Sequence, residues 1–296
     1  MENKPEVRDF LTSRRGRVSP EQVGLPSFGN RRVPGLRRNE AAALAGVSVE
    51  YYTRVERGNL QGVSDSVLDA IASALLMDDT ERMHLHDLAR LSNASPVRSQ
   101  RRVTKPAVPA SATRMVDAMA GLPAFVQNNR FDILYTNPLG RALFSEMFDD
   151  PGCASNTVQF VFFSPAARRF YLDWERIART AVGALRVEAA RNPYDTALSN
   201  LIGGLSTRSD AFRVLWGAND VGAFGDGTKN INHPVVGELQ LEHSAMSLTG
   251  EAGLSMTVYS AAPGSATDDG LALLSSWAAT NLVHSTATAT ATSTET

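Results

Sequence analysis

The sequence predicts a mixed α and β chain: an all-α domain at the N-terminus, followed by an α+β domain. At 296 residues the chain is long enough for two domains. Apolar side chains recur at helical spacing up to about residue 92, whereas strand-like alternation appears only beyond residue 112. Between them lies an aperiodic run rich in Ser, Pro, Arg and Ala, which is typical of a linker. We expect an N-terminal domain over 1–92, a linker over 93–111, a second domain over 112–265, and a C-terminal helix with a disordered tail over 266–296.

Composition and charge narrow the class of protein. With 43% hydrophobic and 20% charged residues, the chain has the composition of a soluble globular protein. It has neither an apolar run of the ~18 residues that a membrane span needs nor a signal peptide. Its one cysteine, Cys153, excludes an intrachain disulfide, so a cytoplasmic location fits best. The net charge of −2 is the sum of +4 over residues 1–105 and −6 over 106–296, which weakly indicates that the first part meets a polyanion.

The first domain is expected to contain five helices. Val7, Phe10 and Leu11 form one apolar stripe over residues 6–17. Residues 19–35 are rich in Pro and Gly and are expected to form a loop. Two helices surround Gly46, a further helix begins at Ser64 as its N-cap, and the last covers about 79–91. The inner face of the helix after Ser64 is predicted to comprise Val67, Leu68, Ile71, Leu75 and Leu76.

The second domain alternates between helices and strands. A helix over 113–122 leads into two strands, PAFVQ and FDILYTN, and Asn137-Pro138 then opens another helix because Pro suits the first helical position. Two long helices are expected over roughly 165–191 and 195–209. The segments NINHPVVGELQLEHSAMSL and LSMTVYSA return to strands, with one wet sheet face. The tail STATATATSTET is low in complexity.

The stretch RNEAAALAGVSVEYYTRVERG, residues 38–58, has the spacing of two crossed helices. Small residues in the first helix allow the second to approach, Gly46 supplies the turn, and Gly58 ends the second helix. Tyr52 and Val55 are expected to pack inward. The outward face then suits a major groove, with arginines placed for phosphate. The predicted DNA contacts are Arg38, Val49, Glu50, Tyr51, Thr53, Arg54 and Arg57.

Plain helix packing in a bundle is the alternative for this stretch. Glu50 either accepts a hydrogen bond from a cytosine, excludes wrong sites by repulsion, or is a solvated surface residue. Tyr51 either contacts a base or a phosphate or is likewise a solvated surface residue. Glu56 is expected to pair with a nearby arginine, because an unpaired carboxylate at a phosphate-rich surface would weaken DNA binding.

With these motifs the stretch resembles the helix-turn-helix of the Cro/C1-type (XRE) bacterial regulators, which implies a lambda-repressor-like fold over roughly 6–92. The longer pattern RRVPGLRRNEAAALAGVSVEYYTRVERGN, followed by VSDSVLDAIASALLMDDTERMHLHDLAR, is similar to the MmyB-like transcription regulators. Asn39 and Ala41 depart from that pattern, where an acidic and a larger aliphatic residue are expected.

The second domain also resembles the ligand-binding domain of MmyB-like regulators over about 112–265, in segments such as GLPAFVQNNRFDILYTNPLGRALF and GTKNINHPVVGEL. The resemblance implies a PAS-like sheet with helices on one side and a pocket between them for a small apolar, fatty-acid-like ligand. Aromatic side chains are numerous here and serve either a core or an apolar pocket. The candidate ligand-binding residues are Phe125, Arg130, Phe131, Ile133, Tyr135, Trp174 and His233, of which Arg130 and His233 are the candidate partners of an acidic head group.

No motif of an enzyme or metal site is found, so we expect no catalytic residue, no metal and no cofactor. His84 and His86 are two residues apart on a predicted helix and point to different faces, which makes a poor metal pair. The sequence therefore predicts a sequence-specific DNA-binding transcription regulator that senses a small apolar ligand and forms a homodimer. The alternative is a DNA-binding regulator whose second domain serves only dimerisation or a protein partner.

Overall fold

The computed structural model of the chain describes residues 4–25, 35–93, 107–153, 155–218, 227–248 and 253–292, with side chains as far as Thr280. The chain forms two compact units. The first comprises Met1–Arg101, Arg179–Ser206 and Asp210–Ala223, and the second comprises Arg102–Ala178, Thr207–Ser209 and Phe224–Thr296. Most of the expected linker, residues 94–106, and most of the expected loop, residues 26–34, lie outside the described residues.

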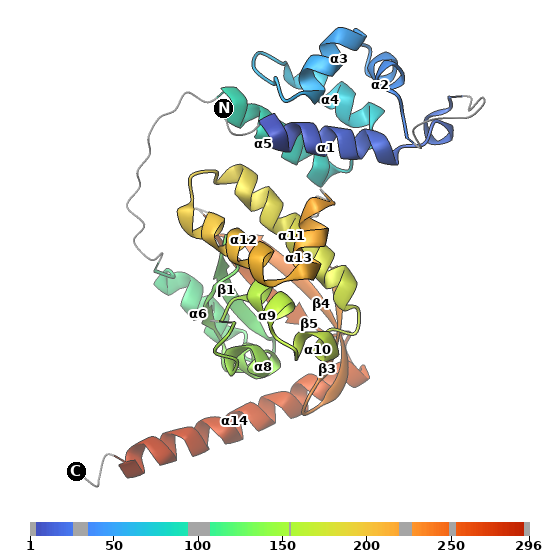
Figure 1. Cartoon of the computed structure of the whole chain (residues 1–296). Coiled ribbons are helices and arrows are strands. Elements are labelled where there is room, and N and C mark those ends of the chain that lie inside the picture. The colour runs from blue at the N-terminus through green and yellow to red at the C-terminus, as the bar shows by residue number, and fades with distance from the viewer. Residues whose placement is uncertain are drawn as a thin grey trace. The chain divides into compact units, whose positions relative to one another are not determined.

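The first unit is built from helices (Figure 1). Its N-terminal elements are α1 (Lys4–Arg17), the short 3-10 helix η1 (Glu21–Val23), α2 (Arg38–Leu44), α3 (Val49–Glu56), α4 (Asp65–Ala74) and α5 (Asp79–Asn93). It also contains α11 (Trp174–Arg191) from Arg179 onward, most of α12 (Thr196–Arg208), and α13 (Asp210–Gly217). As predicted, α1 buries Val7, Phe10 and Leu11, and α11 adds Val187 and Ala190 to the same core.

The inner face predicted for α4 is wrong at one residue. Leu76 is 52% exposed, because the helix ends at Ala74 and Leu76 turns into the left-handed region with φ 49°. The backbone N–H of Met77 then donates to Ala72 O, and the Met77 side chain is buried instead. The helical spacing that placed Leu76 inward does not continue past the end of the helix.

The second unit contains an antiparallel five-stranded sheet with the strand order β2-β1-β5-β4-β3. The strands are β1 (Ala124–Asn128), β2 (Ile133–Thr136), β3 (Gly227–His233), β4 (Gly237–Ser247) and β5 (Leu254–Ser260). Its other elements are α6 (Ala110–Ala118), α7 (Pro138–Leu143), α8 (Ser145–Phe148), α9 (Thr157–Phe163), α10 (Ala167–Phe170), the start of α11, and α14 (Ala266–Thr292). The predicted all-α part followed by a mixed α+β part is confirmed.

One face of the sheet is covered by α6 only at the β1 and β5 end, where Val116 of α6 packs with Val126 of β1 and Met256 of β5. Along β4 this face is exposed at Glu238, Gln240 and Glu242, which agrees with the predicted wet face. The opposite face, which we call the inner face, carries Phe125 and Tyr259, whose rings contact each other. Because side chains alternate along a strand, neighbouring residues of β1 serve different cores.

Two helical predictions need correction in the second half of the chain. The helix expected over 165–191 is interrupted, because the chain leaves α10 at Tyr171 to form an isolated β-bridge with Ile231 before α11 begins. The tail expected to be disordered continues α14 as far as Thr292. Its run of Ala and Thr contains neither Gly nor Pro, so nothing in it blocks a helix. Residues 293–296 lie outside the described residues.

Candidate functional site

The turn between α2 and α3 follows directly from its sequence. Gly46 adopts φ 65°, and the N–H of Val47 donates to Ala42 O at 3.0 Å, which closes the end of α2. Ser48 then caps α3, because its hydroxyl accepts from the N–H of Tyr51 at 3.1 Å. The two helices are thus joined by a short turn of fixed geometry.

The end of α3 is fixed in the same way, with one extra constraint. Gly58 adopts φ 87°, and the N–H of Asn59 donates to Arg54 O. A Cβ at Gly58 would lie 2.5 Å from the backbone oxygen of Lys4. The close approach of α1 to this turn therefore requires glycine in two independent ways.

The inward face of α3 agrees with the prediction. Tyr52 and Val55 are fully buried, as are Ala41 and Ala42 of α2. The small alanines leave room for the Tyr52 ring between the crossed helices. Burial of these side chains fixes the rotation of α3 about its axis, so the other side of the helix faces outward.

Glu56 anchors this arrangement. Its side chain is 1% exposed and accepts from Arg15 Nε at 2.5 Å and from Arg38 Nε. Arg15 also donates to Leu36 O at 2.7 Å, and the hydrogen bond to Glu56 raises the pKa of Arg38. The prediction that Glu56 pairs with an arginine is confirmed, and two arginines do so.

The outward face of α3 carries most of the predicted DNA contacts. Val49, Glu50, Arg54 and Arg57 are exposed, whereas Tyr51 and Thr53 are half-buried. A hollow of about 390 Å³ is lined by Val49, Glu50, Thr53, Arg54, Arg57 and Asn59. The Arg54 guanidinium lies 4.7 Å from the centre of the Tyr51 ring, a cation–π contact that holds it beside the hollow. The face thus offers carboxylate, hydroxyl and guanidinium groups to base edges and phosphates.

Sequence reasoning missed Asn59 in this group. It follows Gly58, outside α3, and helical periodicity therefore did not include it. The signal that could have found it is the glycine itself, because a left-handed helix end folds the next residue back beside the last turn. Arg38, the remaining predicted contact, binds Glu56 through Nε while 49% of its side chain stays exposed.

The candidate ligand-binding residues do not form one cluster in the second unit. Phe125 lies on the inner face, where its ring contacts Phe144 and Tyr259. Tyr135 pairs across the strands with Val126, on the opposite face, and its hydroxyl donates to Asp117 of α6 at 2.7 Å.

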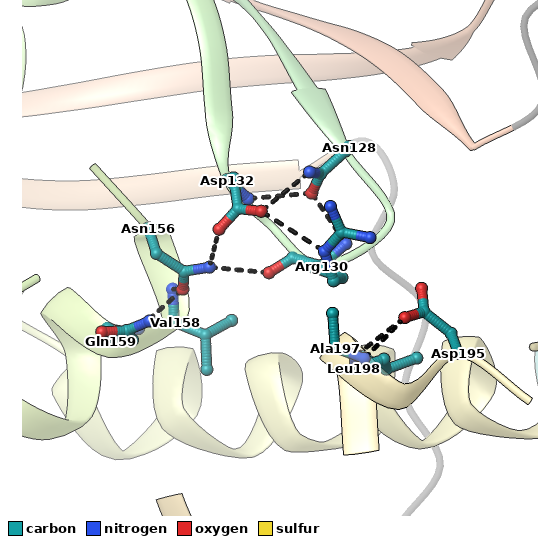
Figure 2. A network of polar contacts seen from close by, with 9 residues as sticks. All are labelled: Asn128, Arg130, Asp132, Asn156, Val158, Gln159, Asp195, Ala197 and Leu198. Carbon is teal, nitrogen blue, oxygen red and sulfur yellow. Dashed lines mark hydrogen bonds and ion pairs between the residues drawn. The ribbon is translucent and has the colours of Figure 1, made fainter. Parts of the chain in front are cut away.

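Three further candidates lie in or directly after the connection between β1 and β2. Asn128 Oδ1 accepts from the backbone N–H of Arg130 and of Asp132, and Asn156 Nδ2 donates to Arg130 O and to Asp132 Oδ1, as Figure 2 shows. Arg130 Nε lies 3.5 Å from Asp132 Oδ2. Phe131 adopts φ 66° and is buried, whereas Ile133 is half-buried in β2. The polar groups around Arg130 therefore stabilise the backbone of this turn.

The last two candidates are held by the protein itself. Trp174 Nε1 donates to Val161 O at 2.9 Å, and the Arg168 guanidinium lies over its ring at 3.8 Å. His233 Nδ1 accepts from the N–H of Val235, so its Nε2 carries the proton and donates to Ala142 O at 3.1 Å. Burial lowers the pKa of His233. Both ring nitrogens are thus engaged, and His233 holds β3 against α7.

No cluster of three or more His, Cys, Asp or Glu side chains that could hold a metal ion occurs in the described part of the chain. None of the described helices is both long enough and apolar enough to cross a membrane.

Comparisons with known proteins agree with the two parts of this architecture. The family model described as helix-turn-helix domain matches residues 6–85, which contain α1 to α4 and most of α5. The family model described as MmyB-like transcription regulator ligand binding domain matches residues 108–274, more than half of the chain. A search of curated proteins found no match. The chain is a DNA-binding transcription regulator with a small-molecule-binding domain, and it belongs to the MmyB-like transcription regulator family.

Proposed function

We propose that α3 reads a specific operator and that a small apolar, fatty-acid-like ligand in the second unit controls this binding. The outward face of α3 carries the proposal, because its exposed polar groups are fixed in place by the buried side of the same helix. In this proposal Val49, Glu50, Tyr51 and Thr53 meet base edges. Arg38, Arg54 and Arg57 meet phosphates.

Two copies of the chain are proposed to bind together. A single short helix such as α3 reads few base pairs, and two linked heads on half-sites about one helical turn apart multiply the affinity. The ligand then favours one relative placement of the two heads over another. The proposal also places the protein in the cytoplasm, where its DNA target is found. Light scattering of the protein with and without a selected operator measures the number of copies bound.

The test of DNA binding compares two arginine variants. Arg54→Ala removes a charge from the outward face of α3, whereas Arg213→Ala removes an equal charge from α13, where that side chain is 60% exposed. We expect Arg54→Ala to weaken binding to all sequences and to reduce the slope of log affinity against log salt by about 1, as loss of one phosphate contact does. Arg213→Ala should leave the slope unchanged.

The measurement is a mobility-shift titration at several salt concentrations, using fragments selected from genomic DNA. Equal slopes for Arg54→Ala and the unmodified protein would remove Arg54 from the interface. Glu50→Gln and Tyr51→Phe should instead change which selected sequence is preferred. Native mass spectrometry of the purified protein tests the ligand part, since a retained lipid-sized adduct supports it and a consistently empty protein opposes it.

A further inference from the structure

The inner face of the sheet contains buried polar side chains that the candidate set did not include. They are Gln127 of β1, Thr257 and Tyr259 of β5, and Lys229 of β3, with exposed fractions of 3%, 0%, 1% and 8%. The strand register places them on one face. Phe125 lies opposite Thr257, and two residues further along β1 Gln127 lies opposite Ser255. Tyr259 lies opposite His243, and Lys229 lies opposite Leu241 on the same side of β4.

Two of these side chains end in polar atoms without a protein partner. Gln127 Oε1 and Thr257 Oγ1 make no hydrogen bond to any described residue, although both are buried. Leaving a buried polar atom unsatisfied costs about 1–3 kcal/mol. Buried polar groups in folded proteins nearly always have a partner, so a partner from outside the chain is indicated here. Because Gln127 Oε1 can only accept, that partner must donate a hydrogen bond.

At the other end of this strip lie two cationic side chains, Lys229 and Arg176. Lys229 Nζ donates to Tyr259 Oη at 2.9 Å, and Arg176 of α11 lies close enough to act on the charge of Lys229. Burial, together with Arg176, lowers the pKa of Lys229 to about 8. The other titratable rings here are His243 of β4, which stacks on Tyr259 at 5.6 Å, and Tyr171. Asp173, which is about half exposed, binds Arg176. A buried ammonium in this setting favours an anion.

The surroundings of the strip are aromatic. The Tyr259 ring lies 6.0 Å from Phe125 and 5.5 Å from Phe144, measured between ring centres. Thr257 and Tyr259 are two residues apart on β5, so their Cα atoms lie roughly 7 Å apart along the strand. An occupant must therefore combine an apolar body with polar groups at two separate points.

We propose that the inner face binds an apolar carboxylic acid that carries a hydroxyl group some distance along its chain. The carboxylate pairs with Lys229 and Tyr259, and the hydroxyl donates to Gln127 and accepts from Thr257. This inference rests on the proposed function and narrows its ligand to hydroxylated acids. It assigns the head group to Lys229 in place of Arg130 and His233, whose polar atoms serve the fold.

The experiment is calorimetric titration of the full-length protein with a matched set of probes: dodecanoic acid, its methyl ester, and hydroxydodecanoic acids with the hydroxyl at different carbons. We expect the acid to bind about tenfold or more tightly than the ester, as the loss of a charge-assisted hydrogen bond predicts. One hydroxy isomer should bind more tightly than the plain acid. Affinity for the acid should fall as the pH rises above about 8, where Lys229 loses its proton.

Variants assign each end of the ligand to its residues. Lys229→Met should remove the preference for acid over ester. Thr257→Val and Gln127→Leu should instead remove the preference for the hydroxy acid and leave the acid-to-ester ratio unchanged. Thr228→Val, at an exposed position of the same strand β3, is the control and should change neither ratio. Thermal unfolding checks that each variant is folded.

Four outcomes separate the two levels of the proposal. Equal binding of acid and ester, or an unchanged ratio in Lys229→Met, overturns the assignment of Lys229. Equal binding of every hydroxy isomer and the plain acid overturns the role of Gln127 and Thr257. If no probe binds but native mass spectrometry shows another apolar adduct, the inference fails and the sensing function stands. If the protein is also empty, both fail.

Discussion

The helix-turn-helix and the inner sheet face treat buried charge in opposite ways. In the first, the carboxylate of Glu56 binds both Arg15 and Arg38, and this contact raises the pKa of Arg38. In the second, Lys229 donates to the neutral hydroxyl of Tyr259, and burial lowers its pKa to about 8. The same kind of group, a cation, is stabilised in one region and destabilised in the other.

The difference indicates how each region meets its partner. Around Glu56 the buried ion pairs complete the structure in the free protein, so under the proposed function the outward side of α3 meets DNA as a rigid surface. On the inner face, Gln127 Oε1 and Thr257 Oγ1 have no hydrogen-bond partner among the described residues. Burial also disfavours the charged form of Lys229, whose pKa is lowered. Such a region gains stability when a ligand supplies the missing contacts. Removing a polar group should therefore harm the first region and stabilise the second.

The largest effect is expected from Glu56→Ala. Both arginines would lose a buried partner, and removal of one member of a buried ion pair typically costs about 3–5 kcal/mol. Urea unfolding followed by far-ultraviolet circular dichroism measures the change. A cost below about 1 kcal/mol, the value of a surface pair, would show that Glu56 does not anchor α3.

Lys229→Met should have the opposite sign. The folded pKa of about 8 lies below the ordinary value of 10.5, so between these pH values the unfolded chain holds a proton that the folded chain has released. The stability of the unmodified protein should therefore rise between pH 8 and 10.5, by at most about 3 kcal/mol. In Lys229→Met this rise should be absent, and at pH 7 the ligand-free variant should be the more stable protein. A variant that is less stable at pH 7 would contradict the comparison.

The two turn glycines test how tightly the first region is built. In Gly58→Ala the new side chain is strained by the left-handed φ and also clashes with the backbone of Lys4. In Gly46→Ala only the left-handed φ causes strain, because no described atom lies within 4 Å of the new Cβ. The φ alone costs about 1–2 kcal/mol, so Gly58→Ala should be clearly the more destabilising of the pair. Thermal unfolding of both variants gives the difference in stability. Equal melting temperatures would mean that the start of α1 at Lys4 can move away from the new Cβ at little cost.

The smallest effect is expected from Thr257→Val, which keeps the shape of the side chain and removes the unpartnered hydroxyl. Replacing it should stabilise the ligand-free protein by about 1 kcal/mol, since the penalty of a buried unsatisfied group disappears. Thr257 lies in the sheet core, so a loss of stability would show that its hydroxyl already has a partner. The measurement is the urea midpoint at constant slope.

Local patterns in the sequence predicted much of the fold. Gly46 forms the turn and Asn137-Pro138 opens a helix as expected, and Tyr52 and Val55 are buried, because each of these features depends on spacing within one or two helical turns. The prediction that Leu76 is buried was wrong, because the helical spacing that places it inward extends past Ala74, where the helix ends. Local spacing predicts an element well and its last residue poorly.

The inner sheet face could not be predicted in the same way. It depends on how β1, β3 and β5 are paired, and a slip of one residue moves a side chain to the other face. The β1–β2 pairing shifts between Val126 and Gln127, and Tyr135 lies on the face opposite Phe125. Sequence reasoning grouped these two residues because both belong to strand-like segments, and it passed over Lys229 and Thr257, whose neighbours are set by long-range pairing.

The pairing of β1 with β5 has a consequence for synthesis of the chain. Helices α1 to α5 are complete once residue 93 has emerged from the ribosome, whereas Gln127 meets β5 only after residue 260 has been made. At usual rates of translation the interval is roughly 10–30 s. A newly made helix-turn-helix is therefore complete before β1 and β5 can pair, so under the proposed function every molecule passes through a ligand-free state before it can respond to a ligand.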